Sequence, residues 1–135
     1  MMGNVLPFRP QAQVSTLRLR EISRNGVGRL TTWFSDNRGA RAKFRIRVQH
    51  LAKIASKDWT WQQFHSLGDG ISEIKWKTGN KQFRAIGFDR DGFFVMVIGC
   101  THKMKVYDPP ECLKSAIRLK KEVENGEWDI VEFEP

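Results

Sequence analysis

Two stretches of the chain alternate between apolar and polar residues and therefore predict half-buried strands. They are residues 16–23 (TLRLREIS) and residues 71–77 (ISEIKWK). In the second stretch, Ile74 and Trp76 occupy one face and point to a core. The opposite face is expected to be wet and mainly cationic, because it carries Glu73, Lys75 and Lys77.

Two further strands follow, each introduced by a turn. Gly and Asn at the turn of residues 78–80 tolerate positive φ, and a strand is predicted at 81–89. A second turn at 89–92 leads to residues 93–101 (FFVMVIGCT), which are apolar at nearly every position. A strand that is apolar on both faces is usually central in its sheet.

Helical periodicity appears twice before residue 57. In residues 28–37, Leu30, Trp33 and Phe34 recur at i, i+3 and i+4, which favours a short helix. Residues 40–56 predict a longer helix, since one apolar stripe runs through Ala40, Phe44, Val48, Leu51, Ala52 and Ala55. Together the two segments predict a helical hairpin.

A third helix is predicted after residue 108. Asp108 is the expected N-cap, Pro109 and Pro110 occupy the first turn, and Glu111 completes a capping box. Asn125-Gly126 marks the C-terminal end. Helical spacing connects Leu113, Ala116, Ile117 and Val123.

These elements predict one α+β domain at residues 14–126. We expect a small twisted antiparallel sheet, with the strand at 16–23 on its outside. The two N-terminal helices should pack on one face, and a C-terminal helix completes the domain. Residues 1–13 are expected to form a flexible arm, and residues 127–135 an acidic tail that is either frayed or packed through its apolar residues.

The connection at residues 57–70 contains three aromatic residues, Trp59, Trp61 and Phe64. Aromatic side chains in a loop either stack on nucleic-acid bases or fold back over the edge of a core. The second arrangement is the more common one, and we expect it here.

The charge of the chain is unevenly distributed. The net charge is +8, and residues 1–57 hold 12 Lys and Arg against two acids. Such a basic half suggests a polyanionic partner, although a merely soluble basic surface explains it as well. No apolar run has the length of a membrane span or of a signal peptide, so a cytoplasmic protein without a membrane partner is expected. Cys100 and Cys112 are expected to be free thiols.

Three short blocks suggest a family. They are residues 70–75 (GISEIK), 82–86 (QFRAI) and 97–103 (VIGCTHK), and two prolines precede the last helix. In order and spacing these blocks resemble the RelE/ParE toxin superfamily, and within it the HigB-type, phage-derived branch. The resemblance covers roughly residues 16–124. Lys75 stands where arginine is commoner in that branch, and His102 stands where the first of two lysines is commoner.

The resemblance implies a RelE-like fold and the toxin of a type II toxin–antitoxin system. Such proteins are metal-independent endoribonucleases that cleave mRNA, often on the ribosome, and a cognate antitoxin, here expected to be a helix-turn-helix protein, holds them inactive. No cofactor or metal is implied. The implied catalytic residues are Arg84, His102 and Lys103, and the implied RNA-binding residues are Lys75, Lys77, Lys105 and Tyr107.

The chemistry fits these residue types. Arginine donates two hydrogen bonds to a phosphate at once, and histidine titrates near neutral pH. His50 and His65 are expected to be structural or solvated, and the histidines and cysteines show no metal-ligand spacing.

Two other functions stay open at this point. A toxin-fold protein without nuclease activity would bind a protein target such as DNA gyrase or nucleic acid, or would serve as a phage accessory protein. A plain basic RNA- or DNA-binding domain is the other alternative, in which the same lysines are solvated surface residues.

Overall fold

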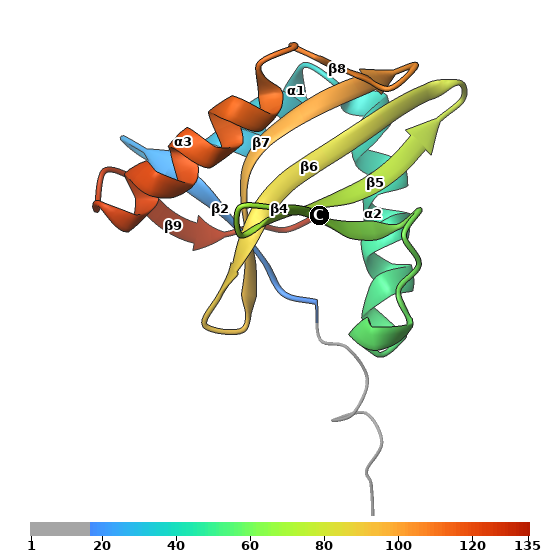
Figure 1. Ribbon diagram of the computed structural model, residues 1–135, viewed down its shortest axis with the longest axis horizontal. Helices are drawn as coiled ribbons and strands as arrows, with labels where there is room; N and C mark the ends of the chain where they lie inside the picture. The colour runs from blue at the N-terminus through green and yellow to red at the C-terminus, as the bar shows by residue number, and fades with distance from the viewer. Residues whose placement is uncertain (1–16) are drawn as a thin grey trace, which may run out of the picture.

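The computed structural model describes residues 17–135 and consists of one twisted sheet with helices on both faces (Figure 1). Its strands follow the order β3-β2-β7-β6-β5-β4, with β8 paired to β7 and β9 paired to β2. The predicted arm at residues 1–13 lies outside the described residues. The elements are β2 (Leu19–Arg24), β3 (Val27–Gly28), α1 (Arg29–Ser35), α2 (Arg38–Ala52), a 3₁₀ turn (Ser56–Asp58), β4 (Phe64–Gly68), β5 (Ile71–Thr78), β6 (Lys81–Arg90), β7 (Phe93–Lys103), β8 (Val106–Asp108), α3 (Cys112–Glu124) and β9 (Asp129–Glu132).

The predicted α+β class is confirmed, and β7 is central as expected, between β6 and β2. Two details of the sheet differ from the prediction. β2 runs parallel to β7, and the long connection that two parallel strands require contains α1, α2, β4, β5 and β6. β2 is also not an outer strand, because β9 covers it with an antiparallel pairing of Ile22 with Ile130.

α1 and α2 pack on one face of the sheet, as predicted. Their buried residues Leu30, Phe34, Phe44 and Leu51 belong to the same core cluster as Trp76 of β5. Phe44 lies 4.7 Å from Trp76 between ring centroids. In Figure 1 both helices lie behind the sheet, and α3 crosses in front of it.

α3 covers part of the other face, and its start and its buried stripe both differ from the prediction. Asp108 ends β8 and caps nothing, and the helix begins at Cys112 without a side-chain cap. The predicted stripe is wrong at Ile117, which is 37% exposed. Residues spaced by three or four positions do form the stripe, but it is rotated to Cys112, Ala116, Leu119 and Val123.

The connection at residues 57–70 contains a strand that the sequence pattern did not reveal. β4 pairs with the first half of β5, with Phe64 opposite Ile74 and His65 opposite Glu73. Trp59 and Phe64 pack against the core, as predicted. Trp61 does not, because it is 65% exposed.

The acidic segment at residues 127–135 is part of the sheet through β9. Phe133 is buried beside Phe34 and Phe44, at 5.7 and 6.1 Å between ring centroids. Arg41 and Arg45 of α2 donate to the backbone oxygens of Glu134 and Pro135. The segment at residues 127–135 is therefore packed on the domain and is not frayed.

Cys100 and Cys112 are free thiols, as predicted, and both are buried. Within residues 17–135, no helix combines the length and the apolar character that crossing a membrane requires.

Replacing Phe133 tests whether the final segment contributes to stability. Phe133→Ala should lower the free energy of unfolding by about 3–5 kcal/mol, because it leaves a cavity between α1 and α2. Urea unfolding measures the difference. Glu134→Ala is the control, since Glu134 is exposed and accepts from Arg41 through its backbone. Equal stability of the two variants would contradict the packing role of Phe133.

Candidate active site

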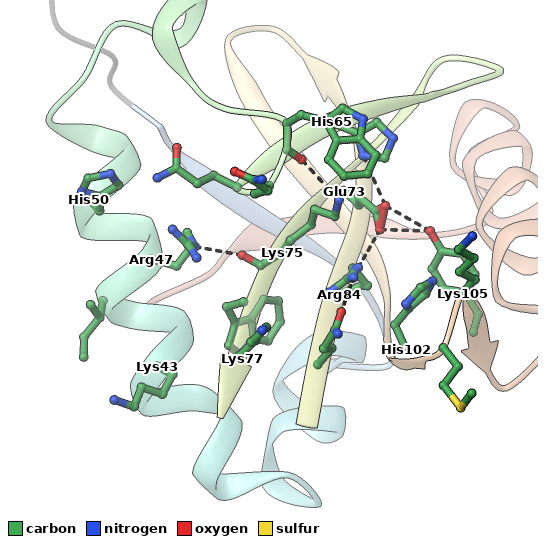
Figure 2. A pocket seen from close by; sticks show the side chains of 18 residues that line it. Lys43, Arg47, His50, His65, Glu73, Lys75, Lys77, Arg84, His102 and Lys105 are labelled. Carbon is green, nitrogen blue, oxygen red and sulfur yellow. Dashed lines mark hydrogen bonds and ion pairs between the residues drawn. The ribbon is translucent and has the colours of Figure 1, made fainter. Parts of the chain in front are cut away.

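A groove opens on the α3 face of the sheet, beside α3. β5 and β6 form its floor, α2 forms one wall, and the turn between β7 and β8 forms the other (Figure 2). The cavity has a volume of about 1280 Å³. The side chains that line it include ten polar or ionisable groups that matter for chemistry: Lys43, Arg47, His65, Glu73, Lys75, Lys77, Arg84, His102, Lys105 and Tyr107.

Strand register brings the groups on the floor together. Side chains two residues apart in β5 share a face, which places Glu73, Lys75 and Lys77 in one row. Lys75 lies opposite Arg84 of β6. His102 of β7 is paired with Gln82 on one side and with Tyr107 of β8 on the other.

Glu73 is the centre of the groove, although the sequence pattern placed it on a wet face. Its side chain is 2% exposed. The Tyr107 hydroxyl lies 3.0 Å from both carboxylate oxygens and donates to them. Arg84 Nε lies 3.2 Å from Oε1, and His65 Nδ1 lies 3.5 Å from Oε2. A buried carboxylate requires such partners, since burial without them is costly.

Arg84 is held in one orientation by three groups. Nη1 donates to the carbonyl oxygen of Phe83 at 2.9 Å, Nη2 donates to Gln82 Oε1 at 2.8 Å, and Nε faces Glu73. A guanidinium has five N–H groups, so one hydrogen remains on each Nη for a ligand in the groove. Because Arg84 is buried and fixed, it can act on a phosphate without first being ordered.

Lys75 is also buried, with 8% of its surface exposed. Its Nζ donates to the carbonyl oxygen of Trp61 at 3.2 Å and lies 3.6 Å from the centroid of the Trp61 ring. Burial lowers the pKa of Lys75, Arg84 lowers it further, and Glu73 acts in the opposite direction. Arg47 of α2 donates to the Lys75 carbonyl oxygen at 2.8 Å and so joins the helix to the open edge of β5.

Two histidines of the groove have lowered pKa values. Burial is the main cause for both His65 and His102, and the charges of Arg84 and Lys75 act in the same direction. Glu73 raises both values in part. At neutral pH both imidazoles are therefore mostly neutral and can accept a proton.

Tyr107 stays protonated at neutral pH. Burial is the largest cause of its raised pKa, and the charge of Glu73 and the hydrogen bond to it add to the effect. The ring of His102 meets that of Tyr107 edge to face at 4.7 Å between centroids. Tyr107 therefore joins His102 to Glu73.

Six of the seven predicted site residues line the groove, and Lys103 does not. Lys103 is exposed and follows His102 in β7, so alternation directs its side chain away from the groove. The sequence predicts no role for Glu73, and it predicts a structural or solvated role for His65. The alternation along β5 places Glu73 on the same face as Lys75 and could have indicated its role. No pattern in the sequence indicates the place of His65, because β4 is not predicted from the sequence.

Within the described residues, no group of three or more His, Cys, Asp and Glu side chains is arranged to hold a metal ion. No protein-family model, curated protein or solved structure matches the chain. The geometry of the groove and the three short blocks of the sequence are therefore the observations that bear on function.

The first prediction for the site concerns the buried charge. Glu73→Gln should lower the free energy of unfolding by about 3 kcal/mol, because Arg84 then keeps a buried charge without its counter-ion. Urea unfolding measures the loss. Glu124→Gln is the matched control, since Glu124 is exposed and pairs with Lys120 on the surface of α3. A loss no larger than that of the control would contradict the role of Glu73.

The second prediction concerns proton binding. In an NMR titration, His65 and His102 should titrate below the ordinary histidine pKa of 6.5, and Glu73→Gln should lower both pKa values further. The unfolded chain binds more protons at mildly acidic pH, so the contribution of these histidines to stability is present above pH 6.5 and is lost as the pH falls. Titration of both histidines at or above pH 6.5 would contradict the lowering of their pKa values by burial.

Proposed function

We propose that the protein is a metal-independent endoribonuclease that cleaves mRNA, in the manner of the toxins of type II toxin–antitoxin systems. One observation carries the proposal. A fixed arginine and a neutral histidine, Arg84 and His102, converge with Tyr107 on one open cationic groove. These are the groups that metal-free attack of a 2′-hydroxyl on a phosphate needs.

The charge of the groove suits a polyanion. Glu73 is the one acid among the described residues that line it, and the Glu73 carboxylate is already engaged by Arg84 and Tyr107. The lining cations come from α2, the floor and the β7–β8 turn, so both walls attract phosphates: Lys43, Arg47, Lys75, Lys77, Arg84 and Lys105. A strand of RNA laid along β5 and β6 meets positive charge on every side.

The roles follow from the protonation states. His102 takes the proton of the 2′-hydroxyl as O2′ attacks phosphorus, and the free N–H groups of Arg84 hold the charge that develops on the phosphate oxygens. The bond to O5′ breaks, and O5′ takes a proton from Lys75, whose lowered pKa makes its ammonium a stronger acid. The products are a 2′,3′-cyclic phosphate and a 5′-hydroxyl.

Tyr107 is a positioning residue in this scheme. Its hydroxyl donates a hydrogen bond to Glu73, and its ring fixes the plane of the His102 ring. Lys77 and Lys105 bind the RNA backbone from the floor and the turn. Lys103 takes no part, because it lies outside the groove.

The partners follow from the same charge. The ribosome presents the mRNA, and the cognate antitoxin, expected to be a helix-turn-helix protein, closes the groove with an acidic segment. Carboxylates are attracted to this surface as readily as phosphates. Binding of nucleic acid or of a protein such as DNA gyrase without cleavage is the alternative, and the activity experiment separates the two.

Inducible expression in bacteria tests the activity. Growth should stop as intact mRNA is depleted, and the cut ends should carry a 2′,3′-cyclic phosphate or the 3′-phosphate formed from it. Arg84→Lys keeps the charge beside Glu73 but loses the planar fork, so cleavage should fall by about 2–4 kcal/mol of transition-state stabilisation.

Lys103→Ala is the matched control, because it removes a cation from the same sheet outside the groove and should leave cleavage unchanged within about twofold. Normal growth with intact ribosome-bound transcripts at high expression would contradict the nuclease proposal. RNA binding without cleavage would favour the alternative.

A further inference from the structure

A second cavity lies on the other side of the β7–β8 hairpin from the groove. It has a volume of about 460 Å³, which is within the roughly 300–1,000 Å³ range of small-molecule sites. Two tryptophans and two arginines line it, and none of the residues within 17–135 that line it is acidic. We call it the tryptophan cavity and define it by Arg24, Arg29, Trp33 and Trp128.

The floor of the tryptophan cavity is a gap in the strand pairing of β7. On its outer side, β7 pairs with β2 up to Met96 and with β8 from Thr101 onward. No strand among residues 17–135 pairs with residues 97–100 on that side. Backbone polar groups at such a gap are free to bind a ligand or water.

The two indoles are held in place. Trp33 lies directly on Gly99, where any side chain would overlap the indole ring. Trp128 Nε1 donates to Glu122 of α3 at 2.8 Å. The guanidinium of Arg24 lies 3.8 Å from the centroid of the Trp128 ring and donates to the Glu127 carbonyl oxygen. Rigid aromatic walls of this kind are suited to stacking on a flat ring.

Arg29 brings a half-buried cation to the cavity. Its Nε is buried and has no hydrogen-bond partner among the described residues. Its guanidinium lies 6.0 Å from the Trp128 ring, and both Arg24 and Arg29 line the cavity. Burial and the charges of Arg118 and Arg24 lower the pKa of Arg29, and the charge of Glu122 raises it in part. An anion in the cavity would give the Arg29 guanidinium a hydrogen-bonding partner.

We propose that the tryptophan cavity binds a nucleotide, with the base against the indoles of Trp33 and Trp128 and the phosphate on Arg24 and Arg29. Aromatic walls with two arginines match a ligand that is flat and anionic at once. The nucleotide is either a free nucleoside monophosphate or one unit of an RNA strand. This site does not depend on RNA cleavage, since its residues are separate from those that line the groove.

Calorimetric titration of the full chain tests the proposal. The probes are adenosine and uridine 5′-monophosphates, inorganic phosphate, and a 2′-deoxy trinucleotide that 2′-hydroxyl attack cannot cleave. At least one nucleotide probe should bind saturably and at least about tenfold more tightly than inorganic phosphate, because phosphate lacks the ring.

Three variants locate the binding. Arg29→Ala should weaken it by about tenfold or more, and Val27→Glu should do the same by placing an acid at the exposed rim without changing the core. Arg90→Ala is the matched control for loss of one surface charge, and it should change the affinity by no more than about twofold.

The loss of affinity in these variants distinguishes a free nucleotide from one unit of an RNA strand. If Arg29→Ala and Val27→Glu weaken the mononucleotides, the ligand is a free nucleotide. If they weaken only the trinucleotide, the cavity holds one unit of a strand. The proposal is overturned if no nucleotide binds saturably at millimolar concentration, if phosphate binds equally well, or if Arg29→Ala and Val27→Glu weaken binding no more than Arg90→Ala does. Thermal melting of each variant verifies its fold, and Val27→Glu keeps the test decisive if Arg29→Ala unfolds.

Discussion

The groove depends on the interaction of one buried carboxylate, that of Glu73, with the cations around it. Glu73 is almost completely enclosed, and its oxygens are engaged by the Tyr107 hydroxyl and the Arg84 guanidinium. A charge in such a place is tolerated only when its partners stay in position. The same contact therefore stabilises the strands and fixes the groups that act on a phosphate. The charge of Glu73 also offsets part of the lowering that burial and Arg84 cause in the pKa values of His65 and His102.

The fold determines why this charge lies in an open groove rather than in a closed core. α3 covers one part of its sheet face, and β4 covers only the first half of β5. Beyond that point α2 reaches around the free edge of β5 through Arg47, which donates to the Lys75 carbonyl oxygen. The cationic groove therefore lies between α2 and the β7–β8 turn, as Figure 2 shows. The basic first half of the sequence thus contributes one wall, and the strands contribute the chemistry.

Much of the fold could be predicted from local pattern, and the site only in part. The strand β5 and the helices α1 and α2 have periodic apolar residues, β6 follows a clear turn, and β7 is a continuous apolar run; all of them are observed. β4, β8 and β9 are short, and they are strands because of their partners, which a local pattern cannot reveal. The same limit explains His65, whose place opposite Glu73 depends on β4. Lys103 was assigned by resemblance, but alternation along β7 directs it away.

The central claim is that Glu73 and Arg84 act as one unit, and a double-mutant cycle tests it most directly. Glu73→Gln, Arg84→Met and the double variant are compared by urea unfolding. Each single change leaves one buried charge without its partner, whereas the double change removes both. The free energy of unfolding of the double variant should exceed the value expected from adding the two single losses by about 1–3 kcal/mol. Additivity within about 0.5 kcal/mol would contradict it.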